Sequence, residues 1–86
     1  MSLQSIYNDV NSEEITFGSH LIQRMWENGI SIDQVLETIL NGIVNKKEKD
    51  EQSDGQFIKY TISKSKIKVV VKDCKPAFII TASRSR

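Results

Sequence analysis

The spacing of apolar residues changes at Gly42, and this change constrains the fold more than any other feature of the sequence. Before Gly42, apolar residues recur at intervals of three or four, as Leu21 and Met25 do, which is typical of amphipathic helices. After Gly42, apolar and polar residues alternate, which is typical of strands with one buried side. The pattern predicts an α+β domain, with two N-terminal helices packed on one face of an antiparallel sheet of about four strands.

Two helices are expected before Gly42. The first covers residues 20–28, with Ser19 as its N-cap and Gly29 as the residue that ends it. The second follows Ser31, and Gln34 stands three residues later, which is the spacing of a capping box. Its apolar residues form one broad face: Ile32, Val35, Leu36, Ile39 and Leu40.

Four strands are expected after Gly42, over residues 43–48, 56–62, 66–72 and 77–83. Short polar turns join them, the first containing Asp54-Gly55, and connections this short place neighbouring strands antiparallel. Residues 1–14 are expected to be a loose lead-in to a single domain over residues 15–86. Residues 15–17 fit either a short strand or an extended segment.

The alternation also predicts which side chains share a face of the sheet. If Lys64 and Ser65 form one hairpin tip and residues 73–76 an even-length loop, one face is almost wholly apolar and is the surface that the helices cover. That face would hold Ile58, Tyr60, Ile62, Ile67, Val69, Val71, Phe78, Ile80 and Ala82. The opposite face would hold Phe57, Lys59, Thr61, Lys68, Val70, Lys72, Ile79, Thr81 and Ser83. A one-residue shift in the second loop would exchange the two sets on the last strand.

Composition excludes several classes of protein. The 86 residues suit one domain with a modest core. The single cysteine, Cys74, rules out an intrachain disulfide, and with one histidine it is too little for a zinc site, so neither a metal nor a cofactor is expected. No apolar run is long enough to cross a membrane, and no signal peptide is recognisable, so a cytoplasmic location is expected.

The charges are divided unevenly along the chain. Residues 1–45 carry six acidic and one basic side chain, a balance of −5, whereas residues 46–86 carry five acidic and eleven basic, a balance of +6. This asymmetry indicates an anionic partner for the second half. The alternative is a solvated surface in which the two halves neutralise each other.

His20 and Arg24 stand four residues apart and therefore share one face of the first helix. A neutral imidazole removes a proton near neutral pH, and a guanidinium binds a phosphate through two hydrogen bonds. The alternative is a surface histidine beside an arginine that pairs with an acid.

Lysines follow the predicted strands and turns. Phosphate binding needs clustered cations, with aromatic groups for stacking, and only Phe57 is expected on the same face. Lysines on exposed strands also prevent edge-to-edge aggregation, which is the alternative explanation. The candidates for binding a nucleic acid are Lys66, Lys68 and Lys72, with Arg84 in the basic tail.

The order of motifs resembles a small bacterial family of domains of unknown function. The shared pattern is a His-x-x-x-Arg-Met helix, here His20 to Met25, then Gly29-Ile30-Ser31 and a β-meander. That family is similar to a wider group of metal-independent ribonucleases and toxins, including RelE-like and barnase-like nucleases. The resemblance places the motif residues at His20 and Arg24 and the terminal-strand threonine at Thr81. Asn28 stands where relatives often carry a second arginine, which weakens the case for phosphate binding.

The resemblance implies metal-independent cleavage of RNA, in which the ribose 2′-hydroxyl attacks the neighbouring phosphate. His20 would act as base or acid, Arg24 and Lys59 would stabilise the phosphate, and Thr81 would position it. A second acid or base is missing, because Tyr60 is expected on the apolar face. A toxin-type protein would also have an antitoxin-like protein partner. The alternatives are a non-catalytic module that binds nucleic acid or an acidic protein through its lysines, and an inactive member of the family.

Overall fold

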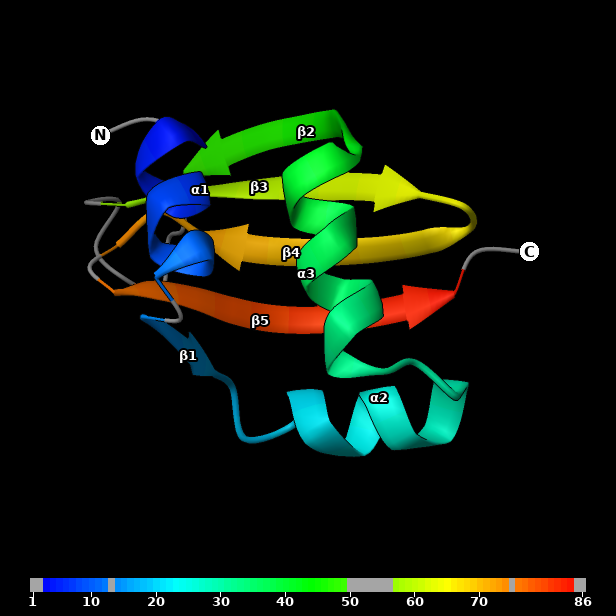
Figure 1. Cartoon of the computed structure of the whole chain (residues 1–86). Helices are drawn as coiled ribbons and strands as arrows, with labels where there is room; N and C mark the ends of the chain where they lie inside the picture. The colour runs from blue at the N-terminus through cyan, green and yellow to red at the C-terminus, as the bar shows by residue number, and fades with distance from the viewer. Residues whose placement is uncertain (1–2, 13, 50–56, 75, 85–86) are drawn as a thin grey trace.

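A mixed sheet flanked by helices forms the domain, and the computed structural model describes residues 3–12, 14–49, 57–74 and 76–84 (Figure 1). The helices are α1 (Leu3–Asn11), α2 (Leu21–Asn28) and α3 (Ile32–Asn41). The strands are β1 (Ile15–Phe17), β2 (Ile43–Lys49), β3 (Ile58–Lys64), β4 (Ile67–Lys72) and β5 (Ala77–Arg84). The predicted turn at Asp54-Gly55 lies outside the described residues.

The sheet has the strand order β1-β5-β4-β3-β2. Strands β2 to β5 form the antiparallel meander that the alternation predicts. The short segment at residues 15–17 is a fifth strand, and it pairs parallel to β5, so the sheet is mixed and larger than the four antiparallel strands expected. A parallel partner distant in sequence leaves no turn signal, which is why its place in the sheet was not predictable.

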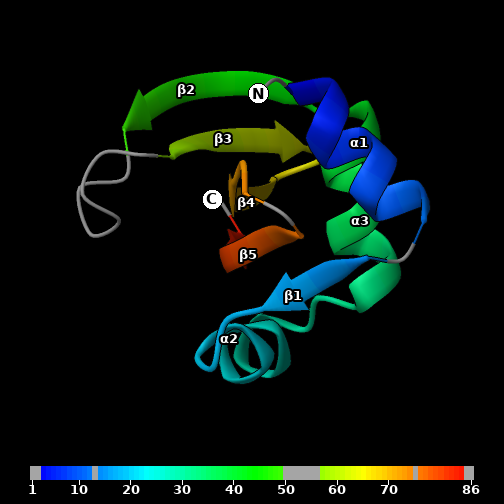
Figure 2. The same ribbon diagram turned by 90° about the vertical axis from the view of Figure 1, so that its left-hand side faces the viewer.

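Helices α1 and α3 cover one face of this sheet, and no described helix lies over the other (Figure 2). Helix α2 lies alongside β5, beyond the point where β1 ends. The apolar core fills the space between sheet and helices. It consists of Ile6, Val10, Leu21, Met25, Ile30, Val35, Ile39, Tyr60, Ile62, Ile67, Val69, Val71, Ala77, Ile79 and Ala82.

Helix α1 contradicts the expected lead-in. Ile6 and Val10 stand one turn apart, and both side chains are buried in the core. Leu3, Ile6, Tyr7 and Val10 recur at helical spacing, a signal that the expected lead-in overlooked, and Tyr7 also packs against the core.

Two of the three signals predicted for the ends of α2 and α3 are confirmed. Ser31 and Gln34 form the reciprocal capping box, with distances of 3.2 and 2.8 Å. Gly29 ends α2 in the left-handed region with φ of 63°. The predicted N-cap at Ser19 is wrong, because α2 begins at Leu21 and His20 is its N-cap without a capping side-chain hydrogen bond.

Gly42 is required where α3 passes into β2. A side chain there would place its Cβ 2.8 Å from both the Ile62 Cγ2 atom and the Ser63 carbonyl oxygen. The residue at which the apolar spacing changes is therefore also the point of closest approach between the helical layer and β3.

The hairpin between β3 and β4 turns one residue later than expected. Ser65 and Lys66 form its tip, and both have positive φ, as a two-residue turn of type I′ requires. Ile62 therefore pairs with Val69 rather than Ile67. Because the register moves by two residues, every side chain of β3 and β4 keeps its predicted face.

Strand β5 corrects the predicted faces. Ala77 and Ile79 are buried against the helices, whereas Phe78 and Ile80 are only partly buried. Val71 pairs with Ile79 and Val70 with Thr81, so Ile80 is the extra residue of a β-bulge. The bulge restores the predicted faces of Thr81 and Ala82, and the one-residue shift thus affects only the first half of the strand.

Candidate nucleic-acid interface

The sheet face without a described helix carries cations and hydroxyl groups, and we call it the open face. Directly paired residues share a face, so the pairs Lys59–Lys72, Lys68–Ser83 and Val70–Thr81 place these side chains together on it. The open face consists of Ile43, Lys46, Glu48, Lys59, Thr61, Ser63, Lys68, Val70, Lys72, Phe78, Thr81 and Ser83.

Two aromatic rings flank one lysine of this face. The Lys72 ammonium lies 5.8 Å from the Phe57 ring centroid and 5.4 Å from that of Phe78. Cation–π attraction at these distances holds the three side chains near one another. The bulge in β5 creates this arrangement, because the sequence alone placed Phe78 among the helices.

Glu48 brings an acidic group to the open face. Its carboxylate lies 3.7 Å from the Lys59 ammonium and 3.5 Å from that of Lys46. Solvent-exposed ion pairs of this kind contribute about 0–1 kcal/mol, so a phosphate competes readily with Glu48 for Lys59.

Arg24 lies on α2 and His20 is the N-cap of this helix, and both side chains are exposed. Leu21 and Met25 define the buried stripe of α2, and helical spacing puts Arg24 on one flank of it and Trp26 on the other. Trp26 shares a hollow with Ser31 and therefore faces α3. The Arg24 flank consequently points to the side on which the open face lies.

The four predicted catalytic residues come from three separate parts of the fold, namely the start and body of α2, strand β3 and strand β5. Thr81 is on β5, beside α2, but Lys59 is two strands away on β3. Two strand spacings put the two backbones about 10 Å apart, so a phosphate group contacts both only through the full length of the lysine side chain. The nearest cations to Thr81 across the sheet are those of β4, Lys68 and Lys72, which the sequence assigned to binding.

The predicted binding residues separate into two groups. Lys68 and Lys72 lie on the open face, and Lys66 lies at the exposed hairpin tip beside them. Arg84 instead donates to the carbonyl oxygens of Asn28 and Gly29, at 2.7 and 3.0 Å. Its guanidinium thus binds the C-terminal end of α2, where a cation is favoured by the helix dipole.

Among the described residues, no second acid or base emerges beside His20. Tyr60 is buried on the covered face, and burial, followed by the charge of Asp73, raises the pKa of its hydroxyl. Burial also raises the pKa of the Cys74 thiol, which donates to the Pro76 carbonyl oxygen at 3.3 Å. Within the described part of the chain, no three His, Cys, Asp or Glu side chains gather as metal ligands would.

The fold and this face define a small α+β domain whose mixed sheet is covered on one side and exposes cations and aromatic rings on the other. The family model described as a domain of unknown function (DUF4258) matches residues 17–84, and the chain belongs to this family. The matched range begins after α1. No curated protein and no solved structure matches the chain. None of the described helices has the length and apolar character needed to span a membrane.

Proposed function

We propose that the open face binds single-stranded RNA. The observation that carries this proposal is the placement of Lys72 between Phe57 and Phe78, with Lys68 and Lys59 on the same face. Single-stranded nucleic acids are bound by cations that contact phosphates and by aromatic rings on which bases stack. Cations spread over neighbouring strands suit an extended chain of phosphates better than a single one.

Fluorescence anisotropy with a labelled single-stranded RNA tests this proposal. Lys68→Gln combined with Lys72→Gln should weaken binding about tenfold and reduce the slope of log K against log salt by about 0.7 for each phosphate that the variant no longer neutralises. Lys49→Gln is the matched control, because Lys49 is exposed on β2 and pairs with Ile58, away from the open face. Salt-independent binding, no binding, or equal losses in the control and the double variant would refute the proposal.

The second candidate function is metal-independent cleavage of RNA, as in the RelE-like and barnase-like nucleases that the motifs resemble. The exposure of His20 and Arg24 beside the open face favours it. His20 would take the proton from the ribose hydroxyl, and Arg24 would stabilise the charge that develops on the phosphate. An antitoxin-like protein partner would belong to this function alone.

Cleavage is tested by incubating the purified protein with total RNA in chelator, beside His20→Ala. Loss of cleavage in the variant, with single-stranded RNA still bound, would support a catalytic role for His20. Equal cleavage by both proteins, or none by either, would reject that role and leave the binding proposal to its own test.

A further inference from the structure

Exposed apolar side chains gather on the other side of α2, away from the open face. Trp26 is 86% exposed, Ile22 one turn earlier is 54% exposed, and Ile32 at the start of α3 is 44% exposed. Single apolar residues at a surface are common, but a cluster that includes an almost fully exposed indole marks an interaction site. We call Ile22, Trp26 and Ile32, with the two hollows beside them, the Trp26 surface.

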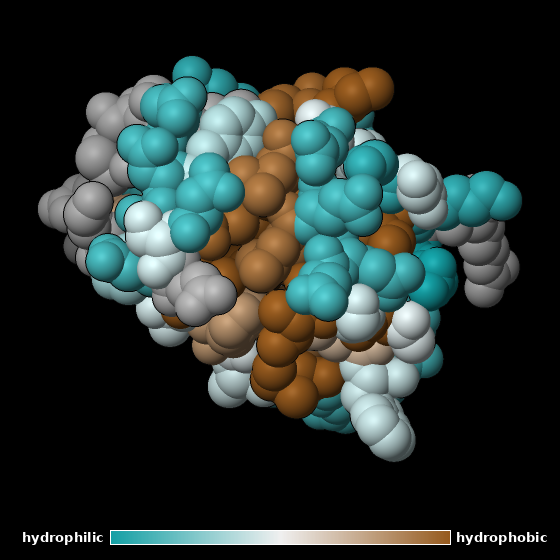
Figure 3. All heavy atoms as spheres, in the orientation of Figure 1, coloured by the Kyte–Doolittle hydropathy of each residue, from teal (hydrophilic) through white to brown (hydrophobic). Residues whose placement is uncertain are grey.

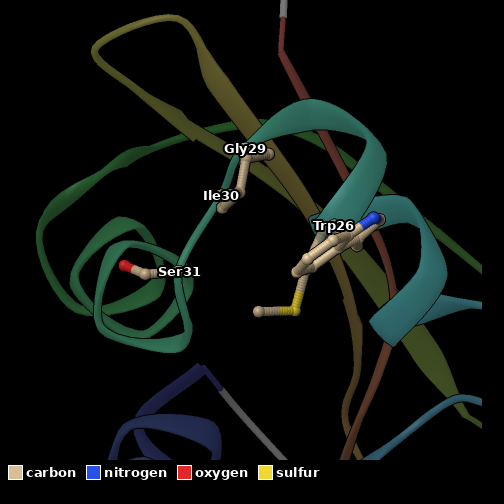
Figure 4. Close-up of a pocket in the computed structure, with 5 residues that line it drawn as sticks. Trp26, Gly29, Ile30 and Ser31 are labelled. Carbon is tan, nitrogen blue, oxygen red and sulfur yellow. The ribbon is translucent and has the colours of Figure 1, made fainter.

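Two hollows adjoin these side chains. One, of about 360 Å³, is lined by Met25, Trp26, Gly29, Ile30 and Ser31 (Figure 4). The other, of about 280 Å³, is lined by Ile15, Phe17, Ile32, Asp33 and Leu36. Ser31 borders the first and Ile32 the second, so both are bounded by the start of α3. A band of apolar atoms runs between α1 and α3 toward β1 on this side of the molecule (Figure 3).

Hydrogen bonds hold the segment between α2 and α3 that separates the hollows. Arg84 donates to the Asn28 and Gly29 carbonyl oxygens. In the first turn of α3, the Gln34 amide donates to the Ser31 hydroxyl oxygen and the Ser31 amide donates to the Gln34 side chain. The Ile30 amide donates to the Met25 carbonyl oxygen at 2.9 Å. A site held in this way loses little conformational entropy when a ligand binds.

The charge around the Trp26 surface is acidic. Asp33 lines the second hollow, and within the described ranges it makes no ion pair. Helices α1 and α3 and strand β1 contain no lysine or arginine. Arg24, the cation of α2, lies on its opposite flank. A ligand of the Trp26 surface therefore has apolar groups and positive charge.

We propose that the Trp26 surface binds a segment of a partner protein in which apolar side chains are flanked by lysine or arginine. The apolar side chains fill the two hollows, and a cation lies against Asp33. A second copy of this chain is the less suitable occupant. Its apolar and basic strand β2 would make a head-to-tail contact, which joins copies into rings or filaments rather than into a twofold dimer.

Selection from a random peptide library displayed on phage tests the proposal without a known partner. Peptides enriched on the wild-type protein should combine apolar residues with lysine or arginine. Ile32→Ser and Asp33→Asn should each weaken binding of the best peptide at least about tenfold, because the first removes an apolar contact and the second removes the acidic charge of the second hollow. Ile43→Ser, a matched exposed isoleucine on β2, should bind it as the wild type does.

Trp26 is the only tryptophan of the chain, so its emission reports directly on the occupied site. The enriched peptide should shift that emission to shorter wavelength and protect it from iodide quenching. Failure to enrich peptides, enrichment without the apolar and basic pattern, or equal binding by Ile32→Ser overturns the proposal. A concentration-dependent emission shift without peptide, with dimers or larger species in sedimentation, overturns it in favour of self-association.

Discussion

Asp73 is a carboxylate in an unfavourable position. Its side chain is 1% exposed, and neither carboxylate oxygen has a hydrogen-bond partner among the described residues. Burial raises the pKa of Asp73, and the charge of Asp9, which is also buried, raises it further. The folded protein thus binds the Asp73 proton more tightly than the unfolded chain does, and ionisation of this group opposes folding.

Asp73→Asn should therefore be more stable than the wild type at pH 7, by about 1 kcal/mol, since the amide cannot ionise. The contribution of Asp73 to stability is present at low pH and is lost as the pH rises through its folded-state pKa, so the advantage of the variant should shrink as the pH falls. Urea unfolding at several pH values measures this difference. Glu14→Gln, at an exposed position, is the control and should show no such trend. A wild type more stable than Asp73→Asn at pH 7 would contradict the expectation.

At the scale of residues, the sequence predicts the face of the sheet on which a side chain lies better than it predicts the neighbours of that side chain. Lys68 and Lys72 lie on the predicted face because alternation determines it, whereas Thr81 does so only because the bulge at Ile80 offsets the shift in the preceding loop. Phe78 does not, because one shifted residue in a loop and one bulge cannot be read from a strand that is apolar on both sides. Asp73 looks like a surface charge in the sequence, since only the packing of α1 and the end of β4 buries it.

Helix α1 offers the clearest test at the scale of elements. Ile6 is fully buried, and Ile6→Ala should lower the free energy of unfolding by about 2–5 kcal/mol, because it reduces apolar burial and leaves a residual cavity. Asn8→Ala, on the exposed side of the same helix, should change it far less, although it removes a side-chain hydrogen bond from Gln4. Urea unfolding compares the two. Equal small effects would mean that residues 3–11 behave as the lead-in expected from the sequence.

Arg84 binds the end of α2, and this contact gives it a structural role. Arg84→Gln should destabilise the domain by about 1 kcal/mol, because glutamine cannot donate to both carbonyl oxygens. The salt dependence of RNA binding should remain that of the wild type, in contrast to Lys68→Gln. Thermal unfolding and anisotropy titrations separate the two roles. If Arg84→Gln instead reduced the salt dependence of RNA binding and left the stability unchanged, Arg84 would be an RNA-binding residue rather than a structural one.

Elements with local signals were predictable, and elements held by distant contacts were not. The capping box at Ser31 and the left-handed Gly29 mark α3 and α2 in the sequence itself. The parallel pairing of β1 with β5 joins residues about sixty positions apart, and α1 depends on a core that forms elsewhere. The β1 pairing has no turn motif that could have revealed it, whereas the spacing of Leu3, Ile6, Tyr7 and Val10 was a helical signal for α1.

At the scale of the whole molecule, the division of charge along the chain becomes a division between surfaces. The basic second half supplies β3, β4 and β5 and their open face, whereas the acidic first half supplies the helices and the Trp26 surface. The body of α2 separates the two, with Arg24 on one flank and Trp26 on the other. The molecule therefore has two separate surfaces of opposite charge, and each can serve a different ligand.

Binding at these two surfaces should be independent. Substitutions without shared partners and well apart in space contribute additively, so Ile32→Ser should leave RNA affinity unchanged and Lys68→Gln should leave peptide affinity unchanged. Titration of RNA into protein saturated with the selected peptide should give the same dissociation constant as titration without it. Competition between the two ligands would show instead that they share a site across α2. Tighter RNA binding in the presence of peptide would show that the surfaces are coupled, and by linkage RNA would then strengthen peptide binding by the same factor.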